Sequence, residues 1–314
     1  MKRYLNFTLK GSQFLPVWIA FIFFFMIPYY LLQGEMASLT AIEVSSEGPS
    51  KLFFIYLLCV VSMAFVFLFY MVKLVVQSLE YNGVRLSVDY HPNKYIGIVI
   101  TGIMLSIISL GIYIPWFIRN LHRFFVHGVV YNSHKFAFRG KGGRLFLTLT
   151  LTIFIPFLVL GIILFSILNS NIDLWIYQII VMFALAPNIY LIYKWLVDIR
   201  YKNYMIKWET KFFPATGRIA GELVLAVLTL GIYFPMAYLR LYRYFTQHTK
   251  SNIVDGKQLI VGYDGHLWSD FLFIWGQILL MIVTLGIYYP WAFSRIIRRV
   301  LNQTYLSTLE LSIA

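Results

Sequence analysis

The chain has 314 residues, of which 60% are hydrophobic, 19% are aromatic and 12% are charged. Soluble domains carry about 25% charged residues, so the composition excludes an ordinary soluble protein and predicts several helices in a lipid bilayer. The formal net charge is +13, which we interpret as a signal of membrane topology rather than of nucleic-acid binding.

Two pairs of long apolar runs predict two helical hairpins. The first pair covers residues 15–33 and 52–76, and the stretch 34–51 between them is expected to be an exposed acidic loop. The second pair covers residues 145–168 and 174–196. Each run has about the length that a helix needs to cross the hydrocarbon core. All four runs are therefore expected to span the membrane.

Short segments of alternating polar and apolar residues flank these runs and are predicted to be strand-like. The expected fold class is an all-α polytopic membrane protein with short strand-like segments on one face and repeated units whose helices are broken by Gly and Pro. The strand-like segments are residues 4–10, 84–90, 135–140, 203–209, 258–263 and 307–312.

One motif occurs three times, as Leu-Gly-Ile-Tyr followed one residue later by Pro. Residues 81–128 align without a gap on 201–248, and a further offset of 55 residues carries the second copy onto the third. This periodicity predicts internal repeats, which we place at 1–128, 129–250 and, as a half-repeat, 251–314, within one integral membrane domain. The recurring residues are Gly111, Tyr113, Pro115, Gly231, Tyr233, Pro235, Gly286, Tyr288 and Pro290.

A kink or chain reversal is expected at each motif, because proline lacks an amide proton and glycine weakens the preceding helical turn. The broken segments are then either re-entrant or interfacial units or, alternatively, full crossings in a protein with seven spans. Re-entry leaves Lys51 as the single outer residue among 26 lysines and arginines, as the positive-inside rule favours. Only residues 223–233 separate Glu222 from its break, which is short for a span. We therefore prefer re-entry, with the N-terminus and the strand-like segments in the cytoplasm.

The repeated motif, the arginine-bearing segment after it and the segment Phe136-Ala137-Phe138-Arg139-Gly140 resemble the YjgN-like family of bacterial inner-membrane proteins, a domain of unknown function. The resemblance covers nearly the whole chain. The chain departs from the pattern at Ser109, where the motif has Thr, and at Met236, where it has Trp, so the polar and aromatic groups at these positions are not expected to be essential. The resemblance implies an inner-membrane location and supplies no substrate, cofactor or catalytic residue.

The segments after the three prolines are amphipathic, cationic and rich in aromatic residues. Such helices suit the headgroup layer, where cations meet anionic lipid. We expect anionic phospholipid headgroups to be partners of this protein. The candidate headgroup ligands are Arg119, Arg123, Arg240, Arg243, Arg295, Arg298 and Arg299.

Three polar residues within apolar runs are candidates for a solute pathway, since polar groups at membrane depth often serve function. Glu222 and Gln277 each lie thirteen residues before a motif proline. The alternative for Glu222 is a structural ion pair with Arg218, one turn earlier on the same helix face. Asn188 follows Pro187, and it either satisfies the carbonyl that proline leaves free or contacts a solute.

No catalytic constellation is recognisable. The histidines lack metal-ligand spacing, the single cysteine, Cys59, excludes a cysteine metal cluster, and no nucleophile motif occurs. We expect no enzymatic activity, cofactor or metal. The first functional hypothesis is a small-solute transporter or channel with its site at the broken helices. The alternative is a non-transporting envelope scaffold that binds lipid or a protein partner.

Overall fold

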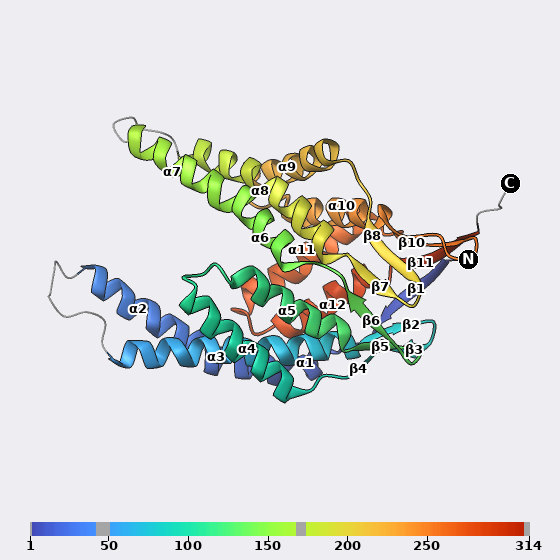
Figure 1. Cartoon of the computed structure of the whole chain (residues 1–314), viewed down its shortest axis with the longest axis horizontal. Helices are drawn as coiled ribbons and strands as arrows, with labels where there is room; N and C mark the ends of the chain where they lie inside the picture. The colour runs from blue at the N-terminus through green and yellow to red at the C-terminus, as the bar shows by residue number, and fades with distance from the viewer. Residues whose placement is uncertain (1, 42–50, 168–173, 311–314) are drawn as a thin grey trace.

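The computed structural model describes residues 2–41, 51–167 and 174–310. Helices extend to one side of the molecule and strands gather at the other (Figure 1). The predicted outer loop falls mostly on residues 42–50, and the short connection between the two apolar runs of the second pair falls on 168–173; both lie outside the described residues.

Eleven strands form one antiparallel sheet in the order β3-β2-β1-β11-β10-β9-β8-β7-β6-β5-β4. The predicted all-α fold is therefore wrong: the strand-like segments pair edge to edge in a single sheet, which satisfies their backbone groups. The strands are β1 (Lys2–Phe7), β2 (Leu79–Tyr81), β3 (Val84–Arg85), β4 (Ser87–Val88), β5 (Val129–Tyr131), β6 (His134–Phe138), β7 (Ile199–Tyr201), β8 (Tyr204–Trp208), β9 (Thr249–Ser251), β10 (Lys257–Tyr263) and β11 (Thr304–Glu310).

The sheet is a nearly closed ring. Its two end strands, β3 and β4, are separated in the chain by Leu86 alone, whose amide donates a 2.9 Å hydrogen bond to the carbonyl of Leu79. The segment 84–88 thus pairs with β2 through its first half and with β5 through its second. Closure leaves little exposed sheet edge.

Tight turns join neighbouring strands around this ring. The loops Asn82-Gly83 and Asn132-Ser133 each have positive φ at both residues, between 46° and 75°. This left-handed geometry matches the twist of antiparallel strands, and asparagine and glycine tolerate it. The two ends of the chain are also neighbours within the ring, since β1 pairs with β11.

The helices lie between paired strands, so the described chain forms five strand–helix–strand units. We number them unit 1 (2–81), unit 2 (84–131), unit 3 (134–201), unit 4 (204–251) and unit 5 (257–310). The helices of units 1 and 3 are α1 (Gly11–Phe21), α2 (Ile27–Ala41), α3 (Lys51–Gln77), α6 (Gly142–Leu149), α7 (Ile155–Ile167) and α8 (Leu174–Leu196). Those of units 2, 4 and 5 are α4 (Pro92–Ile108), α5 (Ile114–His127), α9 (Phe212–Leu228), α10 (Phe234–Gln247), α11 (Leu267–Val283) and α12 (Tyr289–Leu301).

In every unit the strand just before the helices pairs with the strand just after them, as β4 does with β5 in unit 2 and β8 does with β9 in unit 4. The chain therefore enters and leaves each helix group at the same end. The reversal expected at the three Gly-Pro motifs follows directly, because α4 and α5 form an antiparallel pair between β4 and β5. The division of the chain into three sequence repeats, and the insertion of these pairs into a bilayer, stay predictions.

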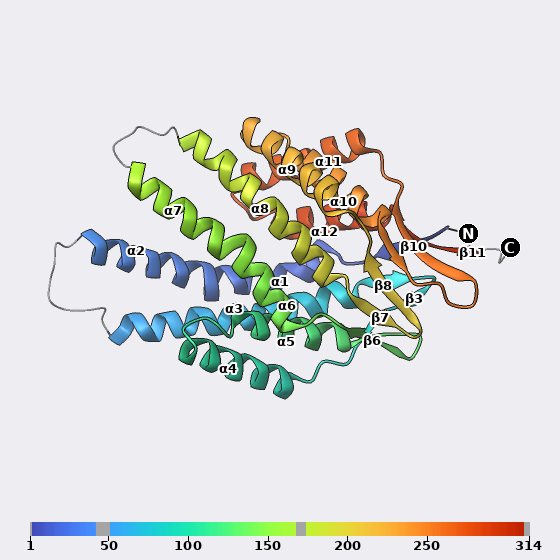
Figure 2. The same ribbon diagram turned by 45° about the horizontal axis from the view of Figure 1, so that its top comes forward.

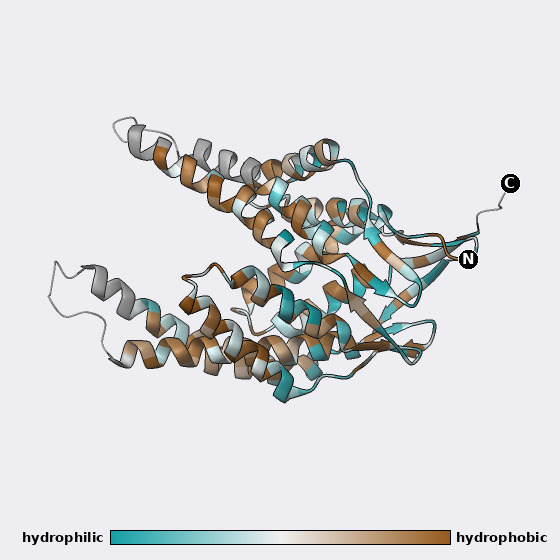
Figure 3. Ribbon diagram, viewed as in Figure 1, coloured by the Kyte–Doolittle hydropathy of each residue, from teal (hydrophilic) through white to brown (hydrophobic). Residues whose placement is uncertain are grey.

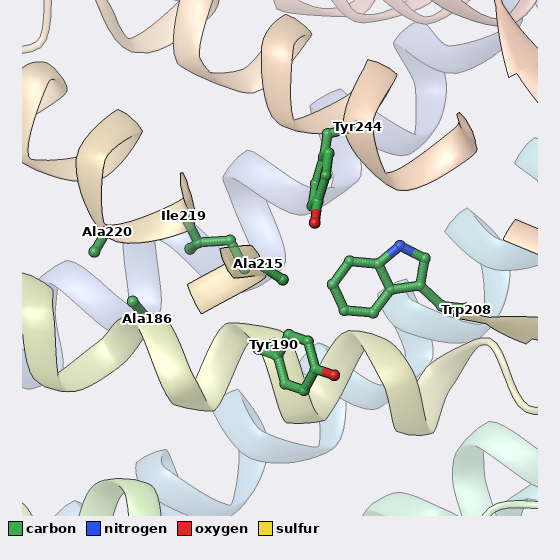
Figure 4. Packing of buried hydrophobic residues seen from close by; sticks show 7 residues of the cluster. All are labelled: Ala186, Tyr190, Trp208, Ala215, Ile219, Ala220 and Tyr244. Atoms are coloured by element: carbon green, nitrogen blue, oxygen red, sulfur yellow. The ribbon is translucent and has the colours of Figure 1, made fainter. Parts of the chain in front are cut away.

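Each buried cluster joins one unit to the next. Between units 3 and 4, Trp208 at the end of β8 lies between Tyr190 of α8 and Tyr244 of α10, with ring centroids 5.0 and 6.2 Å away (Figure 4). Three further clusters each bury an aromatic residue that ends a strand: Phe7 of β1, Phe138 of β6 and Tyr263 of β10. These four aromatic residues at strand ends anchor the sheet to the helices.

Within the described residues, three helices are long and apolar enough to cross a membrane: Gly11–Gly34, Phe53–Gln77 and Gly142–Val159. The helices Pro92–Ile108 and Leu267–Val283 are shorter but also apolar. Figure 2 shows the same separation of helices and strands from a second direction. Hydrophobic residues predominate along the helices away from the sheet, whereas hydrophilic residues gather where helices and strands meet (Figure 3). The molecule is thus divided into an apolar helical part and a polar strand part.

Candidate functional site: the helix reversals and the polar groups behind them

The three helix reversals have the same backbone geometry. Leu110 and Gly111 have φ values of 49° and 89°, and the corresponding residues in units 4 and 5 have values of 53° and 84°, and 49° and 86°. In each case the glycine amide donates to the carbonyl five residues earlier, at 2.7 Å from Gly111 to Ser106. This is the Schellman arrangement, which satisfies carbonyls at a helix end. The proline then begins the returning helix, where its missing amide proton is no loss.

A hydroxyl group fixes the start of each returning segment. The side chains of Ser109, Thr229 and Thr284 accept hydrogen bonds of 2.9, 3.0 and 3.1 Å from the backbone amides of Tyr113, Tyr233 and Tyr288. Ser109 therefore does in the first copy what threonine does in the others. The departure at Ser109 therefore no longer supports the expectation that a polar group here is non-essential, because serine retains the hydroxyl that the turn uses; that expectation stays a prediction.

Behind the reversal in unit 4, a tyrosine connects the two helices through a buried carboxylate. The hydroxyl of Tyr233 donates a 2.8 Å hydrogen bond to Glu222, and the guanidinium of Arg240 lies 3.6 Å from the other carboxylate oxygen. Arg218 is instead placed over the ring of Tyr244, 4.7 Å from its centroid. The partner of Glu222 is thus a cation from the returning helix rather than from its own helix.

Unit 5 repeats this arrangement with an amide in place of the carboxylate. Tyr288 donates a 3.1 Å hydrogen bond to the side-chain oxygen of Gln277 and receives one of 2.6 Å from Arg295. In unit 2 the corresponding tyrosine, Tyr113, receives only a 3.4 Å hydrogen bond from Asn120. Glu222 and Gln277 therefore occupy matching places in two different units.

Asn188 belongs to a different environment. Its amide donates a 2.8 Å hydrogen bond to the hydroxyl of Thr152, which in turn donates 2.7 Å to the carbonyl of Thr148. The three residues link α8 to the broken helix of the same hairpin, where the π-helical turn Thr150–Phe154 precedes Pro156. The structure thus does not bring Asn188 into hydrogen-bond contact with Glu222 or Gln277, and it gives Asn188 an internal partner close to two prolines.

Six of the seven arginines expected at lipid headgroups have a partner within the protein. Besides Arg240 and Arg295, Arg119 donates to the carbonyl of Gly140 at 3.4 Å, and Arg243 donates to that of Gly265. The headgroup role of these side chains stays a prediction. The remaining contacts are those of Arg298 with the carbonyls of Phe7 and Leu9, and of Arg299 with Asp270 and Ser269.

A buried carboxylate in unit 5 was missed by the sequence reasoning. Asp270 is fully buried and accepts hydrogen bonds of 2.7 Å from Arg299 and 2.6 Å from Tyr263. Its position in the first turn of α11 also suits the positive end of the helix dipole. The available signal was an aspartate at the start of an apolar run. Its partner Arg299 lies 29 residues later in the chain, which is too far for the spacing rules of a single helix to connect the two.

The first reversal differs from the other two because Gly102 stands where they have Glu222 and Gln277. Cavities of about 560 and 400 Å³ adjoin one another in unit 2 and share Lys94, Ile98 and Asn120. Neither is lined by Glu222, Gln277 or Asn188. Nor do three His, Cys, Asp or Glu side chains gather anywhere in the described chain as a metal site requires. The open space of this region therefore lies beside unit 2, away from the predicted pathway residues.

Comparison with known proteins gives a family but no activity. A family model described as a bacterial protein of unknown function (DUF898) matches residues 3–261. Inner membrane protein YjgN of Salmonella typhimurium is 35% identical over 66 residues, which make up 21% of this chain and 16% of the relative. No solved structure matches.

Proposed function

Because the chain belongs to the DUF898 family of bacterial proteins of unknown function and is YjgN-like, we propose that it is a multi-pass protein of the bacterial inner membrane that acts as a lipid-binding scaffold. The name of the Salmonella relative and the three long apolar helices support the location. In this proposal the strand ring and the N-terminus lie at the cytoplasmic face, as the positive-inside rule favours. No enzymatic activity or cofactor is part of it.

The main support for the proposal comes from the exposed leucines at the three reversals. Leu110 and Leu285 are 93% exposed and Leu230 is 74% exposed, although all three have φ near +50°. A left-handed residue other than glycine costs about 1–2 kcal/mol, and a fully exposed leucine gains nothing in water. Asparagine or glycine would suit an aqueous turn far better. Leucine suits a tip that lies in hydrocarbon, where burying its side chain is worth about 1.5–3 kcal/mol.

The surroundings and lengths of the short helix pairs agree with tip insertion. Ile112, Ile232 and Ile287, next to the leucines, are also more than half exposed. A returning helix such as α5 has 14 residues, or about 21 Å, which is too short for a core of about 30 Å. The chain enters and leaves each pair at the sheet, so the short pairs would insert into the cytoplasmic leaflet only. The long hairpins of units 1 and 3 would cross the whole bilayer.

Transport is the second candidate, and one observation favours it. Glu222 and Gln277 occupy corresponding places behind two helix reversals, each hydrogen-bonded to a tyrosine that an arginine approaches. Broken helices at matching positions are typical of transporter sites. The scaffold is preferred because these groups are satisfied by one another rather than open to a solute. Proteoliposome swelling with glycerol, urea and amino acids would compare the wild type with Glu222→Gln, Gln277→Leu; flux lost in that variant would establish the pathway.

The depth of the tips tests the scaffold. In a Cys59→Ala background, Leu110→Cys, Leu230→Cys and Leu285→Cys would each be labelled with an environment-sensitive fluorophore and reconstituted in bilayers. We expect quenching by lipids with nitroxide-labelled chains and little quenching by iodide. Lys202→Cys, in a turn of the strand ring, is the matched control and should show the opposite pattern. Tips that iodide quenches as strongly as this control would contradict the proposal.

A further inference from the structure

The arginine eight residues after the motif proline serves a different purpose in unit 2 than elsewhere. In unit 5, Arg298 donates to the carbonyl of Phe7 at 3.1 Å and to that of Leu9, which ties α12 to unit 1. In unit 4, Arg243 reaches the corresponding carbonyl of Gly265 in unit 5. In unit 2 that contact with the next unit is made by Arg119, one helical turn earlier. Arg123 makes no hydrogen bond or ion pair with any described residue.

The freed Arg123 lines the larger unit 2 cavity, which we call the basic cavity. Its 560 Å³ are also lined by Lys94, Asn120 and His127, and by the ion pair of Asp89 with Lys135. Lys135 and His91 lie 2.5 and 3.3 Å from the carboxylate, and the hydrogen bond from Lys135 lowers the pKa of Asp89. Lys94, like Arg123, has no hydrogen bond or ion pair among the described residues. Two cations in this cavity therefore make no hydrogen bond or short ion pair within the described chain, although the charge of Lys94 also acts on Asp89 from a distance.

A second cavity, which we call the slot, continues from the basic cavity along α4 and α5 toward the helix reversal. It has a volume of about 400 Å³ and is lined by Gly97, Ile98, Thr101 and Tyr113, among others. A Cβ built on Gly97 would meet no atom within 4 Å. The absence of a side chain at this position thus keeps the slot open between a charged end and an apolar end.

We infer that the basic cavity binds the phosphate group of an anionic ligand through Arg123 and Lys94, and that the slot receives an acyl chain of a phospholipid. Guanidinium and ammonium groups form charge-assisted hydrogen bonds with phosphate oxygens, and Asn120 adds an amide donor. The phospholipid as source rests on the proposed function, whereas the phosphate site does not.

The other short helix pairs provide an internal comparison. The residue corresponding to Lys94 is Pro214 in unit 4 and Ser269 in unit 5, and the arginines corresponding to Arg123 are already bound to carbonyls. Unit 2 alone among these pairs offers two free cations at matching positions. The inference is accordingly a single site rather than one site per repeat.

Native mass spectrometry of the full chain, purified in detergent and mixed with phosphatidylglycerol or phosphatidylcholine, tests the site. We expect a retained phosphatidylglycerol adduct in the wild type and a loss of at least about tenfold in Lys94→Gln, Arg123→Gln, because two charge-assisted contacts are removed. Lys202→Gln, Lys207→Gln removes the same charge from the strand ring and should leave the adduct unchanged. The charge-preserving variant Lys94→Arg, Arg123→Lys should retain it. Equal adducts in the Lys94→Gln, Arg123→Gln variant and the wild type would overturn the site.

A second pair of variants identifies the source of the phosphate. Gly97→Leu fills the slot and should weaken phosphatidylglycerol binding, whereas Gly217→Leu, at the corresponding open position of unit 4, should not. Calorimetric titration with inorganic phosphate and glycerol 3-phosphate forms the soluble arm. Soluble phosphate that binds the wild type but not Lys94→Gln, Arg123→Gln, without any lipid adduct, would support the phosphate site and overturn the phospholipid. Depth of a labelled Leu110→Cys tip in the same variants distinguishes failure of this site from failure of the scaffold.

Discussion

The ring of Phe117 on α5 occupies the space behind the first helix reversal that a side chain at Gly102 would need. A Cβ built on Gly102 would overlap that ring. In unit 4 the corresponding two residues are Glu222 and Ala237, so a large polar side chain accompanies a small residue on the returning helix. The two positions share one volume, which is filled from either side.

This relationship predicts a compensating pair of substitutions. Gly102→Glu alone should destabilise the protein by about 1–3 kcal/mol or more, because it overpacks a filled site. Adding Phe117→Ala should recover most of that loss, since the pair then resembles unit 4. The free energies of unfolding in detergent would give the coupling by a double-mutant cycle. Strictly additive effects would show that the two positions do not share a volume.

The hydrogen bond across the second reversal predicts a difference between two equivalent tyrosines. Tyr233→Phe leaves one oxygen of the buried Glu222 carboxylate without its donor and should lower the free energy of unfolding by about 1–3 kcal/mol. Tyr288→Phe removes a bond to the neutral amide of Gln277 and should cost about 1 kcal/mol. Chemical unfolding of both variants in the same detergent compares them. Equal losses would mean that the charge of Glu222 is not held by this hydroxyl.

The different roles of two arginines at the same motif position predict different stabilities. Arg298→Met removes donors to two backbone carbonyls of unit 1 and should lower the free energy of unfolding by about 1.5–3 kcal/mol. Arg123→Met removes no contact among the described residues and should change it by no more than about 0.5 kcal/mol. Thermal unfolding followed by size-exclusion chromatography measures both. A large loss in Arg123→Met would reveal a structural role that argues against a free cation.

Two aspartates of unit 5 allow the contribution of a buried ion pair to the free energy of unfolding to be compared with that of an exposed one. Asp270→Asn leaves Arg299 with a neutral partner beside a fully buried position, and should cost about 3 kcal/mol of unfolding free energy. Asp264→Asn breaks the exposed pair with Lys2 and should cost no more than about 1 kcal/mol. The same unfolding measurement serves both. A mild effect of Asp270→Asn would show that the hydrogen bonds of Tyr263 and Gln303 suffice without the charge.

Local patterns in the sequence predicted several features of this molecule. Long apolar runs identified the helices that are long enough to cross a membrane. Alternation located six strand segments within a few residues of β1, β3 to β4, β6, β8, β10 and β11. The strands β2, β5, β7 and β9 have only three residues each, too few for an alternation to be recognised. Their existence depends on partners from distant parts of the chain.

For the candidate site too, local spacing predicted one part of the arrangement, and contacts between separate helices determined the rest. The spacing of the motif placed Glu222 and Gln277 at corresponding positions, but the tyrosine and arginine that hold each of them come from the returning helix. A rule for neighbours on one helix pointed to Arg218 instead. Side chains across a reversal can be matched only when the direction and rotation of the second helix are known.

By itself the sequence determined the membrane character, the family and the threefold helix break, because hydropathy, motif and proline geometry are properties of short stretches of chain. The tertiary structure alone decided that the strands close into a ring, that six motif arginines bind groups of the protein itself, and that Arg123 has no hydrogen bond or ion pair with the described part of the chain. These outcomes depend on which units become neighbours when β1 meets β11, and such contacts between distant residues are set by packing of the whole ring rather than by any local pattern.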